Sequence, residues 1–104
     1  MSKYRNVETN RVCSGGGCVK LTLTDSNSTQ LADHPCRKMY IIAENGDDIQ
    51  FSIGEDVSTN NYGVLPQGAG AGIGGTPLEL AIENTNLVRV KGENTDIVYY
   101  WWIH

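Results

Sequence analysis

Hydrophobic and polar residues alternate in several short segments of this 104-residue chain. The alternation is clearest in residues 19–24, 78–83 and 87–91. Successive side chains of a strand point to opposite faces, so a period of two predicts strands with one apolar and one polar face. Val88 and Val90, for example, would share one face, with Arg89 and Lys91 on the other. Because no segment keeps a helical period over ten or more residues, the pattern predicts an all-β fold.

The segment from Cys36 to Gly54 predicts two further strands joined by a tight turn. Residues 37–43 are rich in residue types that suit a half-buried pleated surface, and residues 49–53 again alternate. Asn45-Gly46 between them is a strong hairpin signal, because a type I′ turn needs positive φ at both central residues. We therefore expect these two strands to pair as the central hairpin of the domain.

The last predicted strand, Ile97 to Ile103, carries four consecutive aromatic residues. Tyr99 and Trp101 would face one way. Tyr100 and Trp102 would face the other way. We expect one pair to fill the core together with the isoleucines at the strand ends, and the other pair to lie on the opposite face or be covered. Tyr and Trp are enriched at protein interfaces, so this strand is a candidate contact surface.

The remaining segments are glycine-rich or polar. Residues 1–11 have no period and predict an extended N-terminal arm, which a partner surface could order. Residues 12–104 have the length of one domain. Short strands separated by turns favour a single small antiparallel β-sandwich or a partly open barrel. Glu55 to Gly75 predicts a loop of about twenty residues, and loops of that length are usually functional or disordered.

Composition and charge narrow the class of partner. The net charge is −4, and the basic residues are interspersed with acidic ones, which argues against a nucleic-acid-binding face. No apolar run approaches the roughly 20 residues that span a bilayer, so no membrane partner is expected. The polar N-terminus lacks the apolar segment of a signal peptide, and we expect synthesis in a cytoplasm.

Cys13, Cys18, His34 and Cys36 form a set with zinc-ligand residue types. Their spacing differs from the paired spacing of zinc motifs, because four residues separate the first two cysteines and one residue separates His34 from Cys36. The default expectation is free thiols, no metal and no cofactor. A disulfide between Cys13 and Cys18 is the alternative in an oxidising environment.

Two other motifs predict neither a binding site nor a catalytic site. Gly70, Gly72 and Gly75 fit a dinucleotide fingerprint, but Thr76-Pro77 and a strand follow where that fingerprint needs a helix. Asp47-Asp48 lies beside the predicted turn, where solvated carboxylates are ordinary. No nucleophile with a neighbouring base emerges, so we expect a protein that is not an enzyme.

The order of elements after Cys36 has a counterpart among known proteins. It comprises a hairpin ending in Ile53-Gly54, a loop with Tyr62-Gly63-Val64-Leu65, a glycine-rich stretch before Thr76-Pro77-Leu78, then Leu87-Val88-Arg89-Val90 and the aromatic strand. This order resembles small β-sandwich virion proteins of tailed bacteriophages, among them capsid decoration (cement) proteins and neck or tail accessory proteins. The resemblance implies a non-enzymatic virion protein that binds the major capsid protein, stabilises the head and associates with itself.

Under this interpretation the arm, the Glu55–Gly75 loop and the aromatic strand are the contact elements. The interface candidates on them are Tyr4, Arg5, Tyr62, Leu65, Tyr100 and Trp102. The alternative is a tail, neck or fibre-associated β module that binds host-surface carbohydrate or a receptor. Exposed aromatic rings would then stack on sugars, and Asn- and Asp-rich loops would bind hydroxyl groups.

Overall fold

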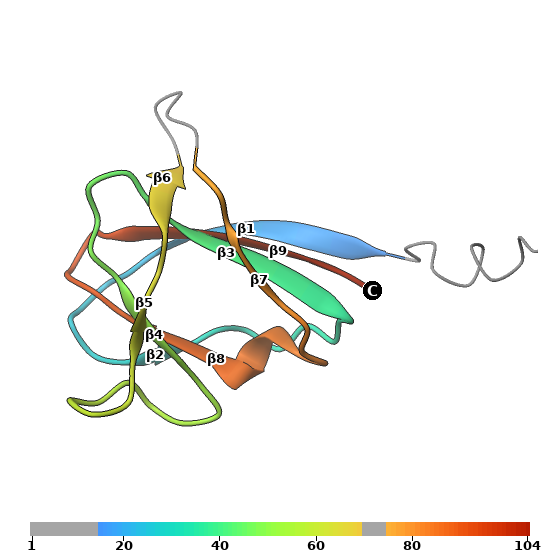
Figure 1. Ribbon diagram of the computed structural model, residues 1–104, viewed down its shortest axis with the longest axis horizontal. Coiled ribbons are helices and arrows are strands. Elements are labelled where there is room, and N and C mark those ends of the chain that lie inside the picture. The colour runs from blue at the N-terminus through green and yellow to red at the C-terminus, as the bar shows by residue number, and fades with distance from the viewer. Residues whose placement is uncertain (1–14, 70–74) are drawn as a thin grey trace, which may run out of the picture.

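The chain folds into two β-sheets packed face to face, as Figure 1 shows for this computed structural model. The structure describes residues 15–69 and 75–104. This arrangement confirms the predicted all-β sandwich. The only helical element among the described residues is a single 3₁₀ turn, η1 (Thr85–Leu87), and no helix in this part of the chain is long and apolar enough to cross a membrane.

The first sheet has the aromatic strand at its centre. Its members are β1 (Gly16–Thr22), β9 (Ile97–Ile103), β3 (Lys38–Glu44), β6 (Gln67–Ala69) and β7 (Leu78–Leu80). β9 pairs antiparallel with β1 on one side and with β3 on the other. β6 and β7 follow one another along the far edge of β3, β6 in parallel and β7 antiparallel. The sandwich is therefore antiparallel except for the β3–β6 pair.

The second sheet is smaller. It contains β2 (Thr29–Gln30), β8 (Val88–Lys91), β4 (Gln50–Ile53) and β5 (Gly63–Val64), in that order and all antiparallel. Val88 and Val90 of β8 are fully buried, whereas Arg89 and Lys91 face away from the core. The alternation predicted for residues 87–91 is thus confirmed.

The core lies between the two sheets and is built from alternate residues of their strands. Its members are Leu23, Leu31, Met39, Ile41, Ala43, Ile49, Leu65, Val88, Val90, Val98 and Tyr100. Met39 and Ile41 of β3 contribute two of the largest side chains with no exposed surface. Removing this apolar surface from water is the main force that holds the two sheets together.

The predicted central hairpin is wrong. β3 and β4 belong to different sheets and do not pair with each other. The turn between them forms, with the amide of Asp47 donating to the carbonyl of Glu44 at 3.0 Å. Only Gly46 has positive φ there (94°), which matches a type II turn rather than type I′. The chain then passes to the second sheet, because β9, β6 and β7 occupy both edges of β3.

The segment Glu55 to Gly75 also differs from the expectation of a loop without strands. β5 and the described part of β6 lie within it. Leu65 donates its amide to the carbonyl of Ile49 at 2.9 Å, and the carbonyl of Pro66 accepts from Ala43 at 2.8 Å. Such strands of two or three residues are too short to show an alternating pattern, so long-range pairing alone defines them.

Candidate functional site

The two aromatic pairs of β9 lie on opposite faces of the first sheet. Tyr100 is only 2% exposed and belongs to the core, because it pairs across the sheet with the inward-facing Ile41. Tyr99 and Trp101 lie on the outer face. The expectation that one aromatic pair fills the core together with Ile97 and Ile103 is wrong, since the isoleucines share the outer face with Tyr99 and Trp101.

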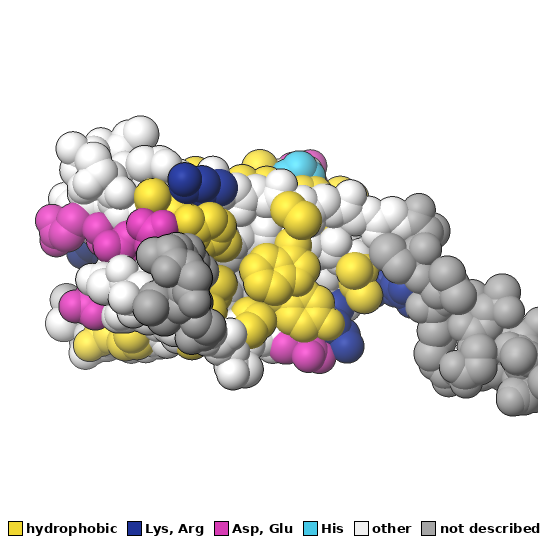
Figure 2. Space-filling model, turned by 90° about the horizontal axis from the view of Figure 1, so that it is seen from above, with side chains coloured by type: hydrophobic (Ala, Val, Ile, Leu, Met, Phe, Trp, Pro, Cys, Tyr) yellow, Lys and Arg dark blue, Asp and Glu magenta, His cyan; other side chains and the backbone are white. Residues whose placement is uncertain are grey.

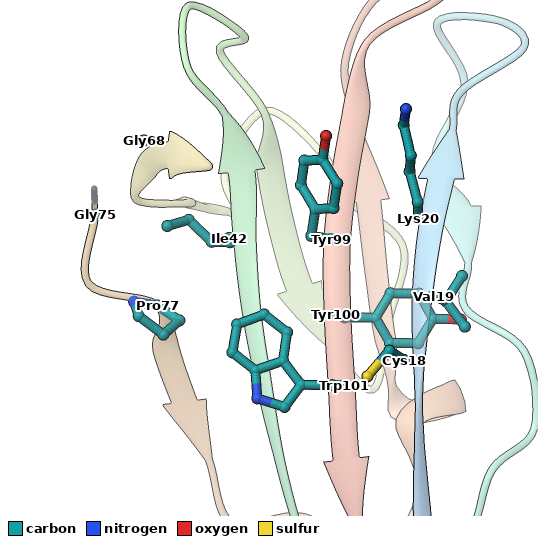
Figure 3. Close-up of a pocket in the computed structure, with 10 residues that line it drawn as sticks. All are labelled: Cys18, Val19, Lys20, Ile42, Gly68, Gly75, Pro77, Tyr99, Tyr100 and Trp101. Atoms are coloured by element: carbon teal, nitrogen blue, oxygen red, sulfur yellow. The ribbon is translucent and has the colours of Figure 1, made fainter. Parts of the chain in front are cut away.

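A groove of about 490 Å³ runs over the outer face of β9. In Figure 3, β1 bounds it on one side, and the segments around Gly68, Gly75 and Pro77 bound it on the other. The residues that line it are Cys18, Val19, Lys20, Ile42, Gly68, Gly75, Pro77, Tyr99, Tyr100 and Trp101. Most of this lining is apolar, so a ligand or partner with apolar groups would fit it.

Aromatic side chains extend this apolar surface beyond the groove. The rings of Tyr40 on β3 and Trp101 on β9 stack, with centroids 5.6 Å apart and planes inclined by 17°. Figure 2, which looks onto this face, shows hydrophobic side chains gathered over the middle of the sheet. We call the groove together with Tyr40 the outer-face patch.

Charged and polar groups surround the outer-face patch. The hydroxyl of Tyr99 donates to Glu44 Oε1 at 2.7 Å, and this hydrogen bond to a carboxylate raises the pKa of Tyr99. Lys38 forms an ion pair with Glu79 at 3.0 Å. An apolar centre with a polar rim is the usual anatomy of a protein–protein interface.

Glycine shapes one wall of the groove. A side-chain carbon at Gly75 would lie 2.7 Å from the carbonyl oxygen of Gln67 and 3.0 Å from Ile42 Cδ1. The absence of a side chain therefore lets this segment close over Ile42, which is only 3% exposed although it faces outward.

The interface candidates inferred from the sequence have different surroundings. Leu65 and Tyr100 are each 2% exposed, so neither offers side-chain surface to a partner, because both fill the core. Trp102 is half-buried and stacks on His34, with centroids 3.9 Å apart. Tyr62 is 49% exposed and borders a hollow of about 580 Å³ beside β5. Tyr4 and Arg5 lie outside the described residues, as does the rest of the predicted arm.

The sequence pattern did not single out Tyr40, Ile42, Tyr99 and Trp101 as a common surface. Pairing of β3 with β9 creates that surface, with Tyr40 opposite Trp101 and Ile42 opposite Tyr99. Strict alternation did divide the aromatic residues correctly into two pairs. It could not say which pair faces the core, since both faces of β9 are apolar.

The described members of the possible zinc set do not come together in the fold. Cys18 is exposed on the outer face of β1, whereas Cys36 is buried and its thiol donates to the carbonyl of Ile82. His34 stacks on Trp102, which faces the core side. Burial raises the pKa of the Cys36 thiol and keeps it protonated. Cys13 lies outside the described residues, and among the others no three metal-ligating side chains come together.

The sequence matches no known family model and no curated protein. The fold therefore defines the class of this protein, a small all-β domain of two packed sheets, and its function is inferred from the surface of that domain.

Proposed function

We propose that this protein is a non-enzymatic structural protein that docks on another protein through the outer-face patch. The observation that carries the proposal is the gathering of Trp101, Tyr99 and Tyr40 on the outer side of a sheet whose inner side already fills the core. Large aromatic side chains that lie together and stay partly exposed, with charges around them, are typical of binding surfaces rather than of free protein surface.

The class of partner comes from the resemblance of the chain to virion proteins of tailed bacteriophages. We propose the major capsid protein as the partner and head stabilisation as the role. A capsid repeats the same docking site many times. A decoration protein that contacts two neighbouring subunits therefore gains apparent affinity through multivalency, although each single contact is modest.

Co-sedimentation with empty capsids of the phage that encodes the chain would test this proposal. We expect the wild-type protein to sediment with capsids and Trp101→Ala to bind at least tenfold more weakly, about 1.4 kcal/mol, because central aromatic residues dominate interface energies. Lys91→Ala is the matched control, since Lys91 is exposed on the second sheet. Failure of the wild-type protein to bind, or equal binding by Trp101→Ala, would refute the proposal.

A carbohydrate-binding module is the second candidate, supported by the stacked rings of Tyr40 and Trp101 at the surface. Aromatic rings bind the apolar faces of sugars. A glycan array separates the two candidates, because binding there without affinity for capsids would favour carbohydrate, and capsid binding without glycan binding would favour the structural role.

A further inference from the structure

Among the described residues, β1 is the outermost strand of the first sheet, and one of its edges has no paired strand. Within residues 15–69 and 75–104 it pairs only with β9. The pairing runs in one register from Gly16 to Thr22, without a bulge. The strand has seven residues, no proline and one charged side chain, Lys20. Natural proteins usually protect edge strands with charges, bulges or prolines, and this edge has little of that protection.

The hydrogen bonds show which residues present their backbone to the open edge. The amide of Leu23 donates to the carbonyl of Asp96 at 2.8 Å, and the carbonyl of Gly15 accepts from His104 at 2.8 Å. Hydrogen-bonded residues alternate along an antiparallel strand, so the odd-numbered residues of β1 bond to β9. The even-numbered residues, Gly16, Cys18, Lys20 and Thr22, therefore direct their backbone groups outward. All four are exposed.

We propose that β1 pairs antiparallel with β1 of a second copy of this chain, about a two-fold axis at Val19. This joins the two first sheets into one continuous sheet. In this register Gly16 meets the partner's Thr22 and Cys18 meets the partner's Lys20. All four outward residues then exchange hydrogen bonds, about eight in total, because each hydrogen-bonded pair makes two.

The edge is complementary to itself, which is what a two-fold dimer requires. A shift of the register by two residues in one direction would place Lys20 directly against the partner's Lys20, and like charges opposite each other are unfavourable. A shift in the other direction leaves Thr22 without a partner among residues 16–22. The register at Val19 avoids both costs.

The same register also covers apolar surface. Val19 and Leu21 are half-buried and pack against the core from the edge of the sheet. Val19 would meet the partner's Val19, and Leu21 would meet the partner's Gly17, next to the Trp102 ring that covers this glycine. On the outer face, β1 forms one wall of the groove, so the two grooves would lie side by side across the axis. The proposal does not depend on capsid binding.

Proline at position 20 gives the sharpest test. The Lys20 amide points to the open edge, so Lys20→Pro removes one inter-copy donor from each copy and leaves the β1–β9 ladder intact, as prolines on edge strands do. Lys20→Thr is the matched control, because it keeps the amide and suits a strand. We expect wild type and Lys20→Thr to have twice the chain mass of 11.4 kDa by light scattering, and Lys20→Pro to be monomeric with an unchanged circular dichroism spectrum.

A monomeric wild-type protein at about 100 µM, where a dissociation constant near 1 µM would give mostly dimer, would overturn the proposal. So would a dimeric Lys20→Pro or a monomeric Lys20→Thr. If Lys20→Pro does not fold, amide hydrogen exchange of the wild-type chain tests whether β1 pairs with a second copy. The amides of Cys18, Lys20 and Thr22 should become protected as protein concentration rises. Protection that is absent, or independent of concentration, refutes pairing with a second copy.

Discussion

The opposite environments of two adjacent tryptophans give the strongest test of this fold. Trp102 stacks on His34, lies 6.0 Å from the ring of Tyr100 and packs against the core. Its ring also covers Gly17, where a side-chain carbon would lie 2.7 Å from the indole. Trp101, on the other face, stacks on Tyr40. We therefore expect Trp102→Ala to destabilise the fold much more than Trp101→Ala.

The size of the difference follows from what the two rings contact, since both are only partly buried. Replacing a buried Trp by Ala lowers the free energy of unfolding by about 3–5 kcal/mol. Because Trp102 is only half-buried, we expect a loss at the lower end of this range, about 3 kcal/mol. Trp101→Ala should lower the free energy of unfolding by about 1 kcal/mol, because its ring packs on Tyr40 and not against the core. Small domains have unfolding free energies of about 5–15 kcal/mol. Trp102→Ala should thus lower the melting temperature by roughly 15 °C, given about 4–8 °C per kcal/mol.

Urea unfolding followed by circular dichroism measures both variants. Because the chain has two tryptophans, each variant leaves one, and its fluorescence reports the remaining environment. The emission of Trp101→Ala should be blue-shifted relative to that of Trp102→Ala, since Trp102 packs against the core beside His34 and Tyr100. Equal losses of stability, or a larger loss for Trp101→Ala, would show that β9 faces the opposite way and would refute the outer-face patch.

Three further predictions concern single groups. Burial raises the pKa of Tyr100. The contribution of this neutral side chain to the stability of the fold is therefore fully present below about pH 10, and it is lost as the pH rises through the pKa of the folded state. Tyr100→Phe should therefore show a smaller drop in urea midpoint between about pH 8 and about pH 11 than wild type, and an equal drop would contradict this reasoning. In a Cys13→Ser background, a thiol reagent should modify exposed Cys18 quickly and buried Cys36 only on unfolding. Fast reaction of both thiols would contradict the burial of Cys36. Gly46→Ala should lower the free energy of unfolding by about 1 kcal/mol, because φ at this position is 94°. No neighbouring atom lies within 4 Å of the added carbon, so no steric clash adds to this cost. An unchanged urea midpoint would exclude this turn geometry.

The test of the outer-face patch by capsid binding depends on this difference between the tryptophans. A Trp102→Ala variant that failed to bind would be uninformative, because it would also lose stability. Trp101→Ala changes the exposed surface at small cost to the fold, so its effect on binding can be attributed to the patch.

Local pattern was sufficient where a strand has one apolar and one polar face. The strand at Val88 to Lys91 was predicted with its faces correctly assigned. Ile97–Ile103, which is apolar on both faces, was predicted with its observed bounds but not with its orientation. The same reasoning failed for β3 and β4. Asn45-Gly46 does form a turn. A turn signal, however, does not determine whether the two strands that it joins pair with each other or with other strands. The pairing of β3 with β9, about sixty residues away, decided the outcome.

The sequence by itself determined that the chain is all-β, because period-two alternation and the absence of helical period depend only on neighbouring residues. It also determined that the aromatic residues of β9 divide between two faces. Only the tertiary structure decided which face is buried, which short segments become β5 and β6, and that Tyr40 meets Trp101. These depend on the register between distant strands, and that register is set by the packing of the whole core.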